Sequence, residues 1–332
     1  MVPKITGITR MQAIRVNASG GADVLTWETI SEPSPQAGEV LVRQEAIGLN
    51  FIDVYHRSGR YDIDPPFTPG VEGAGVVEAV GDDVSGLSVG DRVAQAMQLG
   101  AYAELQVVSA TQLVKVPDDV DTRQAAAAML QGMTAHYLVH STFPLGSEHV
   151  AVVHAGAGGV GRLLIQMAKT AGARVIATAG SPEKVQIAMD VGADDVIAYR
   201  DVDFLEEVQR LTNGVGVDVV YDAVGADTFD RSLGSLKARG MLVLYGASSG
   251  AVPPIDLQKA LTPKSLFVTR PSLGGYIVTR DELEWRSSDI FSSISSGQLL
   301  LKIDREVPLA QAADAHRALE GRETSGKVLL IP

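Results

Sequence analysis

A glycine-rich hexapeptide has the residue types and spacing that point most directly to chemistry in this 332-residue chain. Residues Gly156–Gly161 match the pattern G-x-G-x-x-G and lie between the apolar run His149–His154 and the helical pattern Arg162–Ala171. In such a unit Gly156 permits a tight turn, Gly158 lets the backbone approach a pyrophosphate, and Gly161 lets the helix pack on the strand. The segment predicts a dinucleotide site. A turn without ligand, the alternative, does not need three glycines.

The end of the next expected strand, Arg174–Thr178, distinguishes between the two nicotinamide dinucleotides. A site for NAD places Asp or Glu there to accept a hydrogen bond from the ribose 2′-hydroxyl. This chain has no carboxylate at the strand end, and Ser181 and Lys184 follow it. A hydroxyl and a cation suit a 2′-phosphate, so the pattern favours NADPH. The acid Glu183 beside Lys184 argues mildly against a phosphate here. The alternative for Lys184 is a solvated lysine on a helix that binds no cofactor.

Metal and nucleophile chemistry have little support in the sequence. There is no cysteine, which excludes thiolate nucleophiles and cysteine-based zinc sites. His136 and His140 are spaced i, i+4 on an expected helix, but the glutamate of H-E-x-x-H is missing. Two ordinary histidines are the better interpretation. No G-x-S-x-G nucleophile elbow occurs.

The amino-acid composition indicates which classes of protein this chain can belong to. A net charge of −12 and an apolar share of 45% are typical of a globular protein, and the length suggests about two domains. The acidic balance makes nucleic-acid binding unlikely. No apolar stretch reaches the roughly 20 residues of a membrane span, and no signal-peptide pattern is present. We therefore expect a cytoplasmic protein that does not enter membranes.

The first 120 residues have the pattern of short strands. Glu39–Ala46 is an expected strand, and the closely spaced glycines of Gly70–Gly90 suggest a small barrel. The stretch Asn50–Pro69 contains three prolines, so we expect no regular element there. A helix is expected to begin at Asp121, with Gln124 completing a capping box.

Strands and helices alternate from about Gln131 and predict a doubly wound parallel sheet. After His149–His154 and Arg174–Thr178, its strands are expected at 195–198, 217–221, 240–245 and 265–269. Asp222 is expected to cap a turn. After Gly275 we expect a long helix, a strand near Leu299–Ile303, a helix near Leu309–Glu320 and a strand at Val328–Ile331. These last elements are expected to return to the N-terminal domain.

Together these segments carry a family resemblance. The motifs are Gly48–Tyr55, Arg57–Gly59, Pro69–Gly75, the glycine loop, Tyr221–Gly225, Gly246–Gly250 and Val268–Leu273. The chain resembles the medium-chain dehydrogenase/reductase superfamily and, within it, the zinc-independent, zeta-crystallin-like NADPH:quinone oxidoreductases. Zinc alcohol dehydrogenases of this superfamily have cysteine and histidine ligands where this chain has Asn50 and Val71, and they have a structural-zinc lobe of cysteines. The resemblance therefore implies no metal.

The resemblance implies an α/β fold, with a Rossmann doubly wound parallel sheet and a GroES-like β-rich catalytic domain. The GroES-like domain would comprise residues 1–133 and 275–332, and the Rossmann NADPH-binding domain residues 134–274, with the nicotinamide in a cleft between them. Asn50, Asp53 and Tyr55 would position substrate and nicotinamide as catalytic residues. The implied cofactor-binding residues are Asn50, Phe51, Tyr55, Thr134, Tyr137, Gly156, Gly158, Gly159, Val160, Gly161, Gly180, Ser181, Lys184, Tyr199, Val224, Tyr245, Gly246, Ser248, Arg270, Pro271, Ser272, Leu273, Arg322 and Lys327. For Asn50, Asp53 and Arg270 the alternative is that they satisfy loop backbone groups.

The implied activity is reduction of a quinone by NADPH. A quinone is already electrophilic, so hydride transfer needs positioning and exclusion of water more than acid–base groups. Reduction of α,β-unsaturated aldehydes or ketones is the second interpretation. A non-catalytic NADPH-binding protein, crystallin-like or RNA-binding-like, is the third. The family also implies a homodimer joined at the edge strand 265–270.

Overall fold

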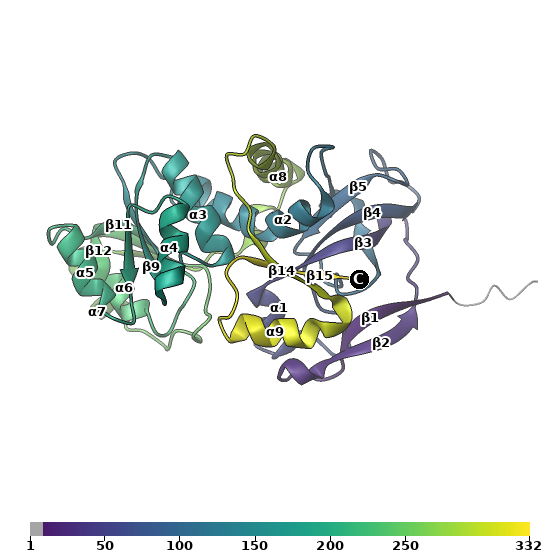
Figure 1. Ribbon diagram of the computed structural model, residues 1–332, viewed down its shortest axis with the longest axis horizontal. Coiled ribbons are helices and arrows are strands. Elements are labelled where there is room, and N and C mark those ends of the chain that lie inside the picture. Colours follow the sequence, from purple (N-terminus) through teal and green to yellow (C-terminus); the bar gives the residue numbers. More distant parts are fainter. Residues whose placement is uncertain (1–8) are drawn as a thin grey trace, which may run out of the picture. The chain divides into compact units, whose positions relative to one another are not determined.

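The computed structural model describes residues 9–332, which divide into two compact units (Figure 1). One unit contains residues 9–130 together with Thr279–Ser295 and Ile303–Pro332. The other contains Gln131–Val278 and Ser296–Lys302. The short segment Ser296–Lys302, which we had assigned to the first domain, therefore clusters with the second unit.

The second unit is built on a six-stranded parallel sheet of order β10-β9-β8-β11-β12-β13. Its strands are β8 (Val150–Val153), β9 (Arg174–Ala179), β10 (Asp195–Ala198), β11 (Val217–Asp222), β12 (Leu236–Leu244) and β13 (Phe267–Thr269). All six residues of β11 are buried, as expected of a central strand covered on both faces. The doubly wound parallel sheet predicted from the sequence is confirmed.

Three of the five helices of this unit begin at a side chain that caps them. The five are α3 (Gly159–Thr170), α4 (Pro182–Asp190), α5 (Phe204–Leu211), α6 (Phe229–Ser235) and α7 (Leu257–Leu261). The capped helices are α4, α5 and α7. The Ser181 hydroxyl accepts from the backbone N–H of Lys184 at 3.3 Å, and Pro182 occupies the first turn of α4, as predicted. Asp203 caps α5 in the same way.

The first unit contains a seven-stranded sheet of order β14-β15-β3-β4-β5-β7, with β6 also paired to β3. The strands are β3 (Glu39–Leu49), β4 (Glu72–Val80), β5 (Arg92–Ala96), β6 (Leu105–Ser109), β7 (Val114–Lys115), β14 (Ile303–Pro308) and β15 (Lys327–Ile331). Strands β1 (Arg10–Val16) and β2 (Leu25–Ser31) pair separately. Because β15 pairs with β3, the end of the chain returns to the N-terminal unit, as predicted.

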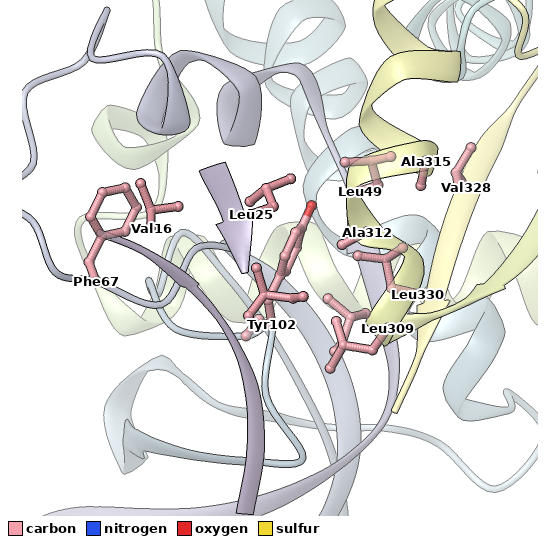
Figure 2. Packing of buried hydrophobic residues seen from close by; sticks show 13 residues of the cluster. Val16, Leu25, Leu49, Phe67, Tyr102, Leu309, Ala312, Ala315, Val328 and Leu330 are labelled. Atoms are coloured by element: carbon pink, nitrogen blue, oxygen red, sulfur yellow. The ribbon is translucent and has the colours of Figure 1, made fainter. Parts of the chain in front are cut away.

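The core of the first unit joins segments from both ends of the chain. Figure 2 shows Leu309, Ala315 and Val328 beside Leu49 and Tyr102. All five are buried. At about 25 cal/mol per Å² of apolar surface, such burial holds the C-terminal segment on this unit.

Two sequence predictions were wrong in detail. Asn50–Pro69 contains the helix α1 (Phe51–Arg57), because the prolines begin only at Pro65 and leave its first turns unbroken. Strand β14 begins at Ile303, where the expected strand near Leu299–Ile303 was to end.

The remaining helices agree with the sequence. The capping box of α2 (Thr122–Tyr137) is confirmed, since Asp121 and Gln124 each accept the other's backbone N–H, at 2.7 and 3.0 Å. The other helices are α8 (Arg280–Ser295) and α9 (Ala312–Glu320). Among residues 9–332, no helix combines the length and the apolar character needed to cross a bilayer.

Candidate active site

The carboxyl ends of the parallel strands bring most of the predicted cofactor residues to one edge of the six-stranded sheet. The loops that follow β8, β9, β11 and β12 begin near Ala155, Gly180, Ala223 and Tyr245. The chain order reverses between β8 and β11, which is the switch point where open α/β sheets bind ligands. The structure therefore places these loops where a dinucleotide site is expected.

The glycine loop has the geometry of a pyrophosphate cradle. A Cβ on Gly156 would lie 2.8 Å from the Ala177 Cβ, and one on Gly161 would overlap the Ala155 carbonyl, so both glycines serve close packing. A Cβ on Gly158 would meet only the Ala155 oxygen, at 3.1 Å. Gly158 is also the N-cap of the twelve-residue helix α3 and has no side chain to cap it. The open side of Gly158 and the helix N-terminus suit an anion.

Backbone strain occurs at the start of this loop. Ala155 has φ of 54°, a left-handed conformation that a residue with a Cβ rarely adopts. Such strain costs about 1–3 kcal/mol and persists where the surroundings fix the backbone. Ala155 thereby turns the chain from β8 into the loop that leads to α3, whose first residues are Gly159 and Val160.

The residues predicted to surround the 2′-phosphate lie together where two neighbouring strands end, with Gly180, Ser181 and Lys184 after β9 and Tyr199 after β10. The N–H of Tyr199 donates to Ala179 at 3.2 Å, and a Cβ on Gly180 would touch the Tyr199 hydroxyl. Ser181 caps α4, and Lys184 is half-buried in its first turn. This corner presents a phenol, a hydroxyl and an ammonium group, which are hydrogen-bond donors for a phosphate.

A buried carboxylate shapes the loop after β11. Asp222 Oδ1 accepts from the N–H groups of Val224 and Gly225, at 2.7 and 3.0 Å. Its Oδ2 accepts from the hydroxyls of Thr228 and Ser232, at 2.7 and 2.9 Å. The prediction that Asp222 caps a turn is confirmed, and the turn fixes the backbone of Val224.

The loops after β12 and β13 are held to each other by Arg270. Its guanidinium donates to the carbonyls of Leu244 and Gly246, at 2.8 and 3.3 Å. These bonds agree with the alternative that Arg270 satisfies loop backbone groups. Ser248 donates its N–H to Ala223 at 3.1 Å. Pro271 and Ser272 lead into a 3₁₀ turn in which Leu273 is buried.

An aromatic pair lies where α2 gives way to a π-helical segment, Leu138–Thr142. The rings of Tyr137 and Tyr276 stack with centroids 4.3 Å apart and planes 8° from parallel. Tyr276 accepts from the Thr142 hydroxyl at 3.0 Å. Tyr137 and the nearby Thr134 are buried.

In the first unit, Asn50 and Asp53 form the start of α1. The backbone N–H of Asn50 donates to Asp53 Oδ2 at 2.8 Å, the return bond of a capping box. Tyr102 donates its hydroxyl to the same oxygen at 3.0 Å. Burial raises the pKa of Asp53 to about 7, although both hydrogen bonds oppose the rise. The spacing Asn50-x-x-Asp53 was the sequence signal for this helix.

The side chain of Asn50 lies in a buried charged cluster with Glu72 and Lys327. The Lys327 ammonium donates to Asn50 Oδ1 at 2.8 Å and also to Glu72 Oε2. Asn50 Nδ2 donates to Glu72 Oε2 at 2.8 Å and to the Gly48 carbonyl at 3.1 Å. From the sequence we predicted that Lys327 contacts the cofactor, and we assigned no role to Glu72. An acidic residue in an otherwise largely apolar strand is the sequence feature that could have pointed to Glu72.

Tyr55, on the second turn of α1, belongs to an aromatic cluster. Its ring meets Tyr61 edge-on at 5.4 Å and lies 6.4 Å from Phe51. The Arg60 guanidinium lies 4.7 Å above it. Arg322 is exposed after α9, at φ of 60°.

The two spaced histidines are neighbours in the structure. The rings of His136 and His140 lie 4.4 Å apart. Within residues 9–332, no group of three or more His, Asp or Glu side chains could hold a metal ion.

Comparison with known proteins defines the class. Residues 36–118 match the model of the alcohol dehydrogenase GroES-like domain, and residues 159–292 match that of zinc-binding dehydrogenases. The fold is thus that of a medium-chain dehydrogenase/reductase. The quinone oxidoreductase of Pseudomonas aeruginosa is 43% identical, covering 96% of this chain and 99% of that protein. The chain belongs to the quinone oxidoreductase family.

Two further relatives extend the comparison. The solved structure of Escherichia coli quinone oxidoreductase complexed with NADPH has a TM-score of 0.95 at 42% identity, covering 97% of this chain and all of that one. A 2-haloacrylate reductase from a Burkholderia species is 40% identical, covering 97% and 99%. Both match nearly from end to end.

Proposed function

We propose that this protein is an NADPH-dependent quinone reductase that works without a bound metal. The observation that carries the proposal is the set of donors after β9 and β10, which are Ser181, Lys184 and Tyr199, in a chain that matches quinone oxidoreductases over nearly its whole length. NADPH supplies the hydride from C4 of its nicotinamide. The glycine loop would hold the pyrophosphate, and these three residues the 2′-phosphate.

The residues of the first unit have a positioning role in this proposal. Asn50, Phe51 and Tyr55 would line the nicotinamide end, with Asp53 fixing the turn that carries them. Tyr55, or a water held by Asn50, would donate a proton to the acceptor oxygen. Apart from Lys327, the remaining predicted cofactor residues, Arg322 among them, would complete the binding surface. The two functional domains would follow the predicted division at about residues 133 and 275.

The proposed independence from metal is supported by the residue types at the ligand positions. Asn50 and Val71 stand where zinc relatives have cysteine and histidine, and the Lys327 ammonium already pairs with Glu72. A divalent cation at that point would meet the positive charge of Lys327. The acceptor must therefore bring its own reactivity, as a quinone does.

The test is NADPH oxidation by the purified protein across a panel of quinones and enones. We expect turnover with 1,4-benzoquinone and naphthoquinones, and none with cyclohexanone. Inert quinones combined with efficient enone reduction would overturn the proposal and favour the second candidate. The 2-haloacrylate reductase supports that candidate, since its named substrate is a conjugated alkene. NADPH binding without any turnover would indicate the non-catalytic alternative.

Assembly and location complete the proposal. Strand β13 ends the six-stranded sheet, and Phe267 on it is exposed, so we propose a homodimer joined at this edge. A cytoplasmic location is proposed because the cofactor is a charged dinucleotide that does not cross membranes.

A further inference from the structure

The buried cluster of Asn50, Glu72 and Lys327 calls for a specific explanation. Lys327 is 2% exposed and Glu72 is fully buried. Taking both charges out of water is costly, and a buried pair adds little net stability over apolar residues. The cluster therefore suggests a role other than holding the fold together.

The hydrogen bonds of the cluster fix one orientation of the Asn50 amide. Lys327 has only donors, so the Asn50 atom 2.8 Å from its Nζ must be the oxygen. The Asn50 nitrogen then faces two acceptors, Glu72 Oε2 and the Gly48 carbonyl. Rotating the amide by 180° would set its NH₂ against an ammonium and its oxygen against a carboxylate.

Glu72 is held in turn by the backbone. Its Oε1 accepts from the N–H of Leu130 in α2 at 2.6 Å, while Oε2 accepts from Lys327 and Asn50. These bonds hold the Glu72 carboxylate in one position next to the Asn50 amide. Since β4, β15 and the N-cap of α1 each contribute one side chain, the cluster sets the position of Asn50 relative to the sheet.

We propose that Lys327 is a positioning residue. Its hydrogen bond to Oδ1 orients the Asn50 side chain for hydride transfer, and its positive charge balances the buried negative charge of Glu72. The inference rests on the proposed function, in which Asn50 lines the nicotinamide end. It replaces the direct cofactor contact that we expected of Lys327.

The test separates orientation from charge neutralisation. Lys327→Met removes the ammonium and leaves Glu72 buried without a counter-ion, so this variant is expected to be destabilised. Adding Glu72→Gln removes the second charge, and the double variant is expected to recover most of its Tm. Lys115→Met is the matched control, because Lys115 also pairs with a carboxylate, that of Asp91, but on the surface of the same unit. The control is expected to leave Tm and kcat unchanged.

The readouts are kcat with 1,4-benzoquinone and, without quinone, the Kd for NADPH. In the double variant we expect kcat to fall roughly ten- to a hundredfold while Kd stays unchanged. Asn50→Ala should cause a similar fall. Adding it to the double variant should cause no further loss, because both changes remove the same positioned group.

Other outcomes would overturn the inference. A double variant with normal Tm and normal kcat would show that Lys327 only neutralises Glu72. A Kd for NADPH that rises in step with the loss of kcat would indicate that Lys327 contacts the cofactor directly. Losses of kcat that add when Asn50→Ala is combined with the double variant would show that Lys327 does not act through Asn50. An inert wild-type protein would instead overturn the proposed function, and this inference with it.

The lack of cysteine allows a second test if the double variant folds poorly. Lys327→Cys would introduce the sole thiol of the chain. Alkylation with 2-bromoethylamine in denaturant, followed by refolding, restores an ammonium on a chain close in length to lysine. Iodoacetamide gives an uncharged control. Activity should return only with the ammonium, and equal activity of the two products would contradict the inference.

Discussion

The phenolic oxygen of Tyr102 lies 3.0 Å from Asp53 Oδ2, and both side chains are fully buried. The same oxygen lies 3.0 Å from His316 Nε2. Because Tyr102 has one hydroxyl proton and gives it to Asp53, the His316 Nε2–H donates to Tyr102 when Asp53 is ionised. Burial lowers the pKa of His316 to about 3, so its ring stays neutral. Through Tyr102, these hydrogen bonds link α1, whose N-cap is Asn50, to α9.

The first prediction concerns the pH dependence of stability. The folded-state pKa of Asp53 is raised to about 7 from 3.8, so the folded protein holds this proton more tightly than the unfolded chain. Its contribution is fully present below pH 3.8 and is lost as pH rises through about 7. The difference in pKa corresponds to about 4 kcal/mol.

Asp53→Asn does not titrate, so it serves as the reference for this change. The wild type should lose unfolding free energy relative to Asp53→Asn as pH rises from about 4 to 7. Denaturant unfolding of both proteins across this range is the measurement. Curves that stay parallel would show that Asp53 keeps an ordinary pKa.

The second prediction concerns cofactor preference. Lys184→Ala should raise the KM for NADPH about ten- to a hundredfold and leave that for NADH nearly unchanged, because a charge-assisted hydrogen bond contributes about 1.5–3 kcal/mol. Lys259→Ala, an exposed lysine of the same unit, is the matched control. Steady-state kinetics with both cofactors would measure this. An equal loss with NADH would place Lys184 away from the 2′-phosphate.

The cofactor half of the site could be predicted because its signals are local. The glycine loop and residues 180–184 are each contiguous in sequence, and Tyr199 directly follows the next strand, β10. Parallel strands bring their carboxyl ends to one edge by geometry alone. The Asn50 cluster could not be predicted in this way. Lys327 meets Asn50 across 277 residues and Glu72 across 255, and no local pattern states which buried charges pair. Helix α1 was missed because the prolines Pro65, Pro66 and Pro69, which follow the helix in the chain, outweighed the capping box at its start.

The third prediction is independence from zinc. Dialysis against a chelator should leave quinone reduction unchanged, since Lys327 supplies the positive charge beside Glu72 and no cysteine is present to bind zinc. Elemental analysis should find no stoichiometric metal. One zinc ion per chain, with activity lost on chelation, would reverse this conclusion.

The fourth prediction concerns the edge strand β13. Light scattering at micromolar concentration should give twice the chain mass of 35.0 kDa. Phe267→Glu places a charge on the exposed edge and should shift the protein to the monomer mass. Val215→Glu, at an exposed apolar residue before the central strand β11, should remain dimeric. A wild-type mass of one chain would exclude the dimer.

The fifth prediction addresses the acceptor through Tyr55. Reducing an unactivated ketone needs an electrophile on the carbonyl oxygen, and the polar groups on α1 and its N-cap, Asn50 and Asp53, are engaged in bonds within their own unit. A quinone can take its proton from solvent, whereas the enolate that develops on an enone needs a nearby donor more. Tyr55→Phe should therefore keep most of the benzoquinone activity and lose enone activity by roughly a hundredfold.

The ratio of the two rates in one preparation is the measurement, because a general loss of folding would lower both equally. An unchanged ratio would show that the Tyr55 hydroxyl is not the proton donor. The water held by Asn50 would then be the remaining source, and Asn50→Ala should lower the enone rate more than the quinone rate.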